Sequence, residues 1–207
     1  MGWKVIKAKY RYDEDLNAYI PDEESETTIK ELCTTGQGFI PIGYRYGANH
    51  FSGIFYGEKQ GENQEEQLEI KNIYIKTANC AALFGEVSGA TIKNITIGGE
   101  ITCTSGNNAA GFVGYGHGCK LENCCNKCNI TNIGTGYAAG IWGNGYSTSI
   151  TRCINEGEII SVNHQAFGIS SIFVKLNRCR NYGNVTGKSW SGGICRKRLG
   201  RTSWLNV

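Results

Sequence analysis

The chain repeats itself along its length, and this repeat constrains the fold more than any other feature. Three separate segments recur, and all three shift together by 29, 29 and then about 26 or 27 residues. The first series comprises AALFG at 81–85, AGFVG at 110–114, AGIWG at 139–143, AFGIS at 166–170 and GGICR at 192–196. The second comprises IKNI at 92–95, LENC at 121–124, ITRC at 150–153 and LNRC at 176–179, and the third GEI at 99–101, CNI at 128–130, GEI at 157–159 and GNV at 183–185. Such joint recurrence indicates one structural unit present in several copies.

Each unit holds three short β-prone segments that are separated by clusters of Gly, Asn and Ser. Apolar residues alternate within them, as Ile95 and Ile97 do on either side of Thr96. One unit cannot bury its apolar face alone, whereas stacked units pair strand with strand and bury a continuous column. The sequence therefore predicts an all-β fold, a right-handed parallel β-solenoid (β-helix) with three short strands per coil of about 26–29 residues.

The boundaries of the repeat predict three regions. IKNIYI at 70–75 matches IKNITI at 92–97, so the coil begins upstream, near residue 36. We expect residues 1–35 to form a strand-containing N-terminal cap, because an open solenoid end exposes unpaired strand edges. Residues 36–195 form the predicted solenoid, and residues 196–207 a basic C-terminal tail.

The order FIPIGY, FSGIFYG, IKNIYI, AALFGEVSGATIKNITI, AGFVG and LENCCNKCNI resembles the GLUG-type repeats of bacterial surface proteins. Such repeats also occur in non-catalytic regions of some IgA-specific metallopeptidases. The resemblance covers residues 36–195 and implies a solenoid module at the cell surface, or secreted, within a larger protein.

Membrane insertion and export receive no support from the chain itself. No apolar run approaches the roughly 18–20 residues of a spanning helix, and no signal peptide begins the sequence. A cytoplasmic location therefore remains an alternative to the surface location that the resemblance implies.

Charge is distributed unevenly along the chain. Of 18 acidic residues, 13 lie at or before Glu69 and none follows Glu158. The C-terminal stretch is basic, with Lys175, Arg178, Arg180, Lys188, Arg196, Lys197, Arg198 and Arg201. This gradient favours a solvated surface, with head-to-tail self-association as the alternative. A nucleic-acid partner is disfavoured because no aromatic-basic motif accompanies the charge.

Two columns of equivalent residues are predicted to be structural. Cys124, Cys153 and Cys179 should stack in the core as free thiols, since free cysteine behaves as a small hydrophobe. Asn126, Asn155 and Asn181 should form a hydrogen-bonded ladder at a bend, where Asn tolerates a left-handed backbone.

A zinc site is the alternative interpretation of the cysteine cluster Cys119, Cys124, Cys125 and Cys128, with His117 nearby. The repeat opposes it, because Cys124 and Cys125 are adjacent and should point to opposite faces of a strand. We expect no metal and no cofactor.

Catalytic constellations are not evident, and the prediction is a protein that is not an enzyme. Three histidines fall in different turns, and the acids of the solenoid do not cluster. A fragment of a carbohydrate-active enzyme is the alternative, and it would require Glu100 and Glu158, two coils apart, to converge. Ice binding is less favoured, because Thr91, Thr96, Thr102, Thr104 and Thr131 are not expected to recur in columns.

Aromatic residues at or near turns are the candidate binding residues, namely Tyr115, Tyr137, Tyr146, Tyr182 and Trp190. Trp142 aligns with Phe84 and Val113, so a place in the core and a sugar-stacking role both remain open. The predicted function is a non-catalytic structural or adhesive module, either a rigid spacer or a surface that binds a glycan or a host or bacterial surface protein.

Overall fold

The computed structural model describes residues 10–13, 18–21, 38–43, 50–57, 68–172 and 174–196, and these contain strands but no helix. The first strands are β1 (Tyr10–Asp13), β2 (Ala18–Pro21), β3 (Ile54–Tyr56) and β4 (Leu68–Thr77). The following coils contain β5 (Phe84–Ser88), β6 (Thr91–Cys103) and β7 (Ala109–Ala110), then β8 (Val113–His117), β9 (Lys120–Asn132) and β10 (Ala138–Ala139). The remaining strands are β11 (Trp142–Tyr146), β12 (Ser149–Thr151), β13 (Ile154–Asn155), β14 (Ile159–Ser161), β15 (Ala166–Phe167), β16 (Lys175–Asn177), β17 (Arg180–Asn181), β18 (Val185–Gly187) and β19 (Ser191–Gly192).

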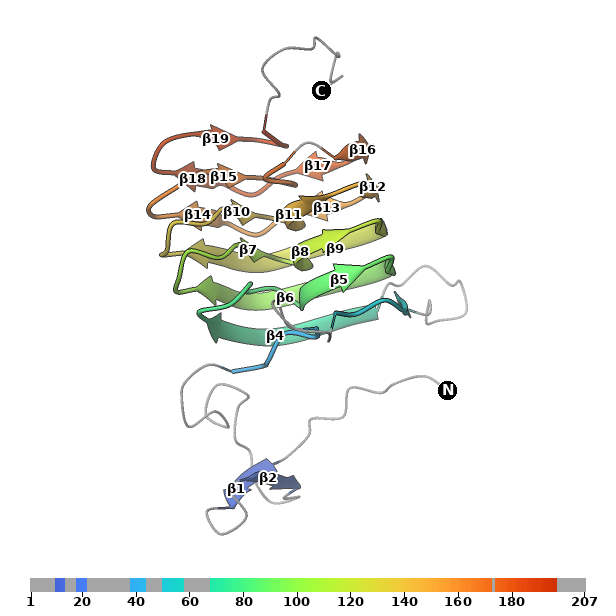
Figure 1. Ribbon diagram of the computed structural model, residues 1–207, viewed down its shortest axis with the longest axis vertical. Helices are drawn as coiled ribbons and strands as arrows, with labels where there is room; N and C mark the ends of the chain where they lie inside the picture. The colour runs from blue at the N-terminus through green and yellow to red at the C-terminus, as the bar shows by residue number, and fades with distance from the viewer. Residues whose placement is uncertain are drawn as a thin grey trace.

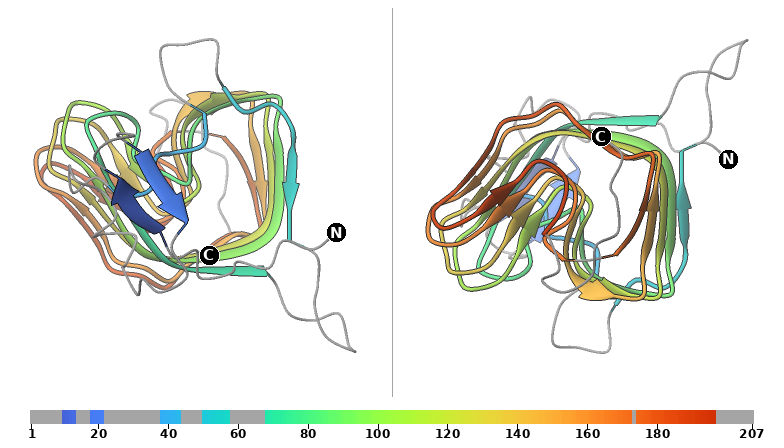
Figure 2. Two further views of the ribbon diagram at one scale, coloured as in Figure 1. Left: turned by 90° about the horizontal axis from the view of Figure 1, so that it is seen from below. Right: turned by 90° about the horizontal axis from the view of Figure 1, so that it is seen from above.

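Strands from β3 onward pair in parallel with the equivalent strand of the next coil, which confirms the predicted all-β parallel solenoid. The coils lie one above the other (Figure 1), and seen along the axis they nearly superpose (Figure 2). In Figure 1 the chain runs to the right along β5 at the front and returns to the left along β6 while it climbs, so the winding is right-handed.

Three of the predicted segments are present in each coil, but their division into strands is finer than expected. The second and third segments form one continuous bent strand in β6 and in β9. The first segment divides into two ladders, β7–β10–β15–β19 and β5–β8–β11. Between the third segment and the short ladder the chain forms a loop in each coil, at 104–108, 133–137, 162–165 and 188–190, and these loops stack as a lobe on one side of the solenoid (Figure 2).

The register of the shortened coil differs from the simple alignment of the sequence. Ala166 pairs with Ala138, and Phe167 with Ala139, so the prediction that placed Ala166 opposite Ala139 was wrong by one residue. The shortening is distributed: the offset is 28 residues at this ladder but 26 where Lys175 follows Ser149. A loop can lose residues only where the chain leaves the ladders, and each coil has more than one such place.

The core is a set of columns that run along the axis. Ile92, Leu121 and Ile150 form one buried column, and Ile101, Ile130 and Ile159 form another. Each fully buried aliphatic side chain of this kind contributes about 1.5–3 kcal/mol. The stack is consequently stabilised chiefly by contacts between coils.

The predicted terminal regions lie largely outside the described residues. Of residues 1–35, the structure describes only β1 and β2, which form an antiparallel pair with each other. Of the predicted tail 196–207, it describes only Arg196. Within the described part of the chain, no helix has the length and apolar character needed to span a membrane.

Candidate functional site

The front sheet, which we define as β5, β8 and β11, presents two outward columns of polar and aromatic side chains. Register places Glu86, Tyr115 and Asn144 in one column. It places Ser88, His117 and Tyr146 in the other. The residues that alternate with them face the core, so the two columns form the outer surface of this sheet.

The second column is joined by direct contacts. The rings of His117 and Tyr146 are stacked, with centroids 5.1 Å apart and planes inclined by 13°. On its other side His117 shares a 2.9 Å hydrogen bond between its Nε2 and the Oγ of Ser88. Tyr146 is 56% exposed, so this short polar and aromatic stack ends in a ring that is open to solvent.

A left-handed corner follows this column in every coil of the front sheet. Gly118 has φ +66° and Ser147 has φ +53°, and this conformation turns the chain sharply into the next side. Two inward-facing side chains support the corner: the Cys119 thiol donates to the carbonyl of His117 at 3.0 Å, and the Thr148 hydroxyl donates to that of Tyr146 at 3.2 Å. The backbone that holds the two rings is therefore fixed immediately after each ring.

A depression of about 540 Å³ lies at this corner, directly beyond the ring pair. Its lining includes Gly118, Lys120, Ser147, Thr148, Ser149 and Lys175. Ser147 directly follows Tyr146 and Gly118 directly follows His117, so the ring pair forms its rim. The depression thus combines an aromatic edge, hydroxyl groups and two ammonium groups.

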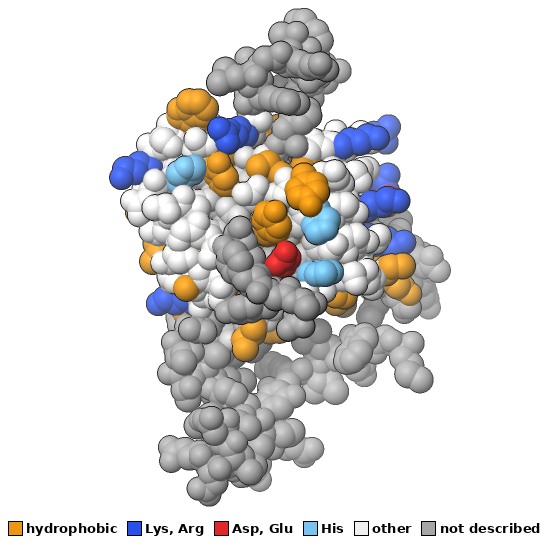
Figure 3. All heavy atoms as spheres, in the orientation of Figure 1, with side chains coloured by type: hydrophobic (Ala, Val, Ile, Leu, Met, Phe, Trp, Pro, Cys, Tyr) orange, Lys and Arg blue, Asp and Glu red, His pale blue; other side chains and the backbone are white. Residues whose placement is uncertain are grey.

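The space-filling view of this face shows histidine, acidic and apolar side chains gathered over the front sheet (Figure 3). Lys and Arg side chains follow the edge on the side of β12 and β16. The front sheet therefore meets a basic edge at the corner that contains the depression.

The five aromatic residues predicted to bind a ligand do not form one site. Tyr115 and Tyr146 lie together on the front sheet. Tyr137 lies in the lobe, where its ring is 4.8 Å from that of His164 and 6.4 Å from that of Phe167. Tyr182, 67% exposed, and Trp190, 56% exposed, lie on other parts of the surface.

Trp142, for which two roles remained open, belongs to the core. It is fully buried and pairs in register with Val113, which pairs in turn with Phe84. Its indole Nε1 has no hydrogen-bond partner among the described residues. The ring consequently serves as an apolar filling group and is not available to a ligand.

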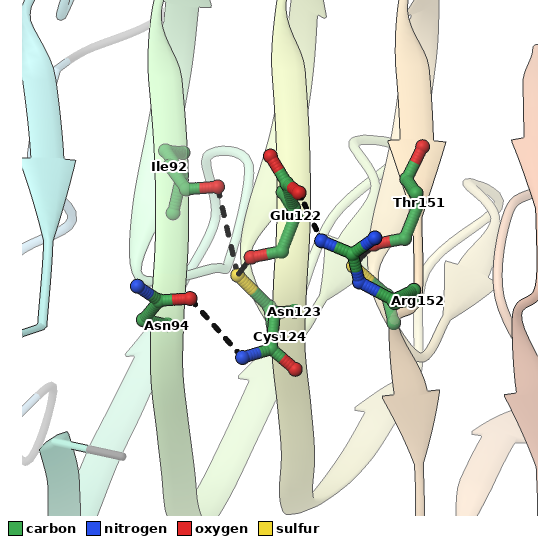
Figure 4. Close-up of polar contacts among 8 residues, drawn as sticks. Ile92, Asn94, Glu122, Asn123, Cys124, Thr151 and Arg152 are labelled. Atoms are coloured by element: carbon green, nitrogen blue, oxygen red, sulfur yellow. Dashed lines mark hydrogen bonds and ion pairs between the residues drawn. The ribbon is translucent and has the colours of Figure 1, made fainter. Parts of the chain in front are cut away.

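The cysteine column lies inside the solenoid. Cys124 and Cys153 are buried and Cys179 is half-buried, at successive positions of one column given by the strands that flank them. The Cys124 thiol points toward the carbonyls of Ile92 and Glu122 (Figure 4). All nine cysteines among the described residues are free.

The asparagine column is hydrogen-bonded along its length. Asn126 donates from Nδ2 to the Oδ1 of Asn155, and Asn155 donates in the same way to Asn181, both at 2.7 Å. The expected left-handed backbone is wrong for these three residues: the non-glycine residues with positive φ among those described are Asn72, Asn94, Asn123, Ser147, Arg152 and Arg178. Asn126 fits its bend through side-chain bonds to Cys128, and not through an unusual φ.

A left-handed column of Asn94, Asn123, Arg152 and Arg178 was not anticipated from the sequence. Asn123 donates from Nδ2 to the Oδ1 of Asn94 at 3.1 Å, and Arg152 pairs with Glu122 (Figure 4). The common offset of the four residues is the signal that could have found it. The consequence for the site is that the carboxylate of Glu122 is already engaged by a guanidinium group.

The CxxC cluster does not converge on a point. Burial raises the pKa of Cys128 to about 12, and burial together with the charge of Glu156 raises that of Cys125 to about 11. Thiols with such pKa values remain protonated near neutral pH and are poor metal ligands and nucleophiles. Among the described residues, no three His, Cys, Asp or Glu side chains are grouped so as to hold a metal ion.

The acidic and threonine columns on the third side were only partly foreseen. Glu100 pairs with Asn129, and the Glu158 amide donates to the Asn129 Oδ1, so an amide residue separates the two carboxylates. The prediction that the threonines form no column was wrong, since Thr102 pairs directly with Thr131. The next residue of that column is Ile160, which interrupts the array before Thr186.

His117 is the residue of the front sheet that sequence reasoning did not select as a ligand-binding candidate. It was considered only as a neighbour of the cysteine cluster, although it lies 29 residues from both Ser88 and Tyr146. That common offset was visible in the sequence, and it would have placed the three side chains in one column.

No family model, no curated protein and no solved structure matches this chain.

Proposed function

We propose that this chain is a non-catalytic β-solenoid module that binds a glycan on its front sheet, within a bacterial surface protein of the GLUG-repeat type. The observation that carries the proposal is the stacked pair of His117 and Tyr146 at the rim of the corner depression. A rigid exposed ring offers a flat apolar face at a small entropic cost, and hydroxyl groups beside it supply hydrogen bonds. This combination suits a sugar ring, which has an apolar face and a polar circumference.

The rigidity of the scaffold supports this role. Tyr146 stands on a strand that pairs in register with β8, and the carbonyl of Tyr146 accepts hydrogen bonds from the Gly118 amide and the Thr148 hydroxyl. The ring is thus held on a sheet and not on a free loop, so little ordering accompanies binding. A column of paired coils also provides the stiffness that a spacer on a surface protein requires.

The test is retention on a panel of immobilised polysaccharides and a glycan array, with the wild type compared with Tyr146→Ala. Tyr182→Ala is the matched control, because Tyr182 is even more exposed but lies away from the front sheet. We expect Tyr146→Ala to lose about tenfold in affinity, as is typical when one stacking aromatic residue is removed, and Tyr182→Ala to bind as the wild type does. Equal behaviour of the two variants, or an array without any bound glycan, would reject glycan binding at the front sheet.

A further inference from the structure

We infer that the ligand of the front sheet is an acidic glycan, whose carboxylate or sulfate groups bind between Lys120 and Lys175 at the corner depression. This inference rests on the proposed function and adds the chemical class of the sugar. Its evidence is separate from the ring pair, because it comes from the charges on the other side of the depression.

The two lysines belong to one outward column. Lys120 pairs in register with Ser149, and Ser149 with Lys175, so a single serine separates the two ammonium groups along the axis. Both lysines are exposed, and both line the depression. Two coils correspond to about 10 Å, a span that the long side chains can close around one anionic group or use for two successive groups.

The charge of these lysines is not balanced within the described residues. The described ion pairs join Lys71 and Lys127 to Glu69 and Arg152 to Glu122, and none of them involves Lys120 or Lys175. Glu122 follows Lys120 by two positions on the same face of β9, and it is the carboxylate that the sequence places nearest. Because Arg152 engages it, the corner retains a net positive charge.

The surroundings reinforce this sign. Arg178 is exposed at the left-handed corner that follows β16, and no acidic residue follows Glu158 in the chain. The acid of the front sheet, Glu86, stands in the other outward column and in the first of its three coils. An anionic sugar that stacks on Tyr146 therefore meets two unpaired ammonium groups and the hydroxyl groups of Ser147 and Ser149.

A neutral glycan would leave this arrangement unused. It could stack on the ring and accept hydrogen bonds from the hydroxyl groups, but it would bring no charge to the lysine column. An acidic glycan satisfies the aromatic and the cationic sides of the depression together, and this is why the geometry favours it.

The experiment compares the full chain with two matched double variants, Lys120→Gln/Lys175→Gln and Arg180→Gln/Lys188→Gln. Each removes two exposed positive charges, but Arg180 and Lys188 lie outside the depression. The probes are polygalacturonate, a sulfated galactan, a neutral galactan and duplex DNA, and the readout is affinity by titration at several salt concentrations. Carboxylate and sulfate sources are distinguished by the first two probes.

The expected result is that one of the acidic glycans binds more tightly than the neutral galactan. Lys120→Gln/Lys175→Gln should weaken that binding by a factor on the order of ten and flatten its salt dependence, while the control double variant should change it by less than about twofold. Far-ultraviolet circular dichroism of both variants should remain that of the wild type, because all four side chains are exposed.

Other outcomes separate this inference from the proposed function. Binding of neutral and acidic galactans with equal affinity, lost in Tyr146→Ala but not in the lysine variant, would overturn the acidic ligand and leave the glycan site standing. Equal weakening by both double variants, with duplex DNA bound as well as the glycans, would show a general attraction of polyanions and overturn the inference. Failure of every glycan to bind would reject the proposed function itself.

Discussion

Asn126 donates a 2.7 Å hydrogen bond from its Nδ2 to the Oδ1 of Asn155, one coil further along the axis. Each amide also donates to a carbonyl of its own bend, Asn126 to Cys128 at 3.1 Å and Asn155 to Gly157 at 2.8 Å. Both side chains are fully buried. A buried amide is tolerated only when its groups are paired, and here the pairing links successive coils to one another.

Replacing Asn155 with alanine should therefore destabilise the solenoid markedly. The change leaves the Asn126 Nδ2 and the Gly157 carbonyl without their partners, and each such buried group costs about 1–3 kcal/mol. We expect the free energy of unfolding in urea to fall by about 3 kcal/mol. Asn184→Ala, at an exposed position one coil away, should change it by less than about 0.5 kcal/mol. Similar losses in both variants would show that the ladder contributes no special stability.

A second prediction concerns the glycine opposite this ladder. A Cβ atom at Gly140 would lie 2.1 Å from the Gly168 carbonyl oxygen and 2.5 Å from the Cγ of Asn155. Neither atom can withdraw without disturbing the backbone or the ladder, so Gly140→Ala should cost about 1–3 kcal/mol or more in thermal or urea unfolding. At Gly193 no atom lies within 4 Å of the added carbon, so Gly193→Ala should be neutral or slightly stabilising. A neutral Gly140→Ala would contradict the close approach of the two walls.

The buried thiols predict a loss of stability in alkali. Burial raises the pKa of Cys128 to about 12 and that of Cys179 to about 11, from an ordinary value of 9.0. The folded chain keeps these protons while the unfolded chain releases them, so the thiols favour folding fully below pH 9. This contribution should fall as the pH rises from about 9 to about 12.

The measurement is the midpoint of urea unfolding at pH 8 and at pH 10.5. Cys128→Ala should show a smaller decrease between the two pH values than the wild type, since it lacks one of the perturbed groups. At pH 8 a thiol reagent should modify the native chain slowly and the urea-unfolded chain rapidly. Rapid modification of Cys128 in the native chain would contradict its burial.

Trp142 provides a spectroscopic prediction. It is fully buried with its Nε1 unpaired, whereas Trp190 is 56% exposed. Trp142→Phe should remove the blue-shifted part of the fluorescence spectrum, and Trp190→Phe should leave it. Because phenylalanine keeps most of the ring and removes an unpaired donor, Trp142→Phe should cost much less than Trp142→Ala, for which about 3–5 kcal/mol is expected. Retention of the blue-shifted emission in Trp142→Phe would contradict this placement.

The agreement between sequence and structure is best seen in the columns. Cys124 and Ile95 are 29 residues apart in sequence and adjacent in space, because parallel coils stack in register and turn a sequence offset into a contact. The same relation would have placed His117 beside Tyr146 and Thr102 beside Thr131, had the offset been followed through the outward-facing positions as well.

The candidate site was less predictable, because it depends on where different sides of one coil lie relative to one another. Tyr115 and Tyr137 are both near turns of the same repeat, yet one stands on the front sheet and the other contacts His164 in the lobe. The direction of each turn is set by local backbone conformation, such as the left-handed Ser147, for which a repeat pattern carries little information.

The sequence by itself determined the parallel β-solenoid, its repeat length and the residues that share a column, since periodic burial of apolar side chains leaves few other ways to satisfy the backbone. The tertiary structure alone decided where the shortened coil loses its residues, as the pairing of Ala138 with Ala166 shows, and which side chains meet at a corner. Tyr146 and Lys175 meet at one depression because the chain turns between strands, and the angle of that turn results from packing of the whole coil and not from spacing along the chain.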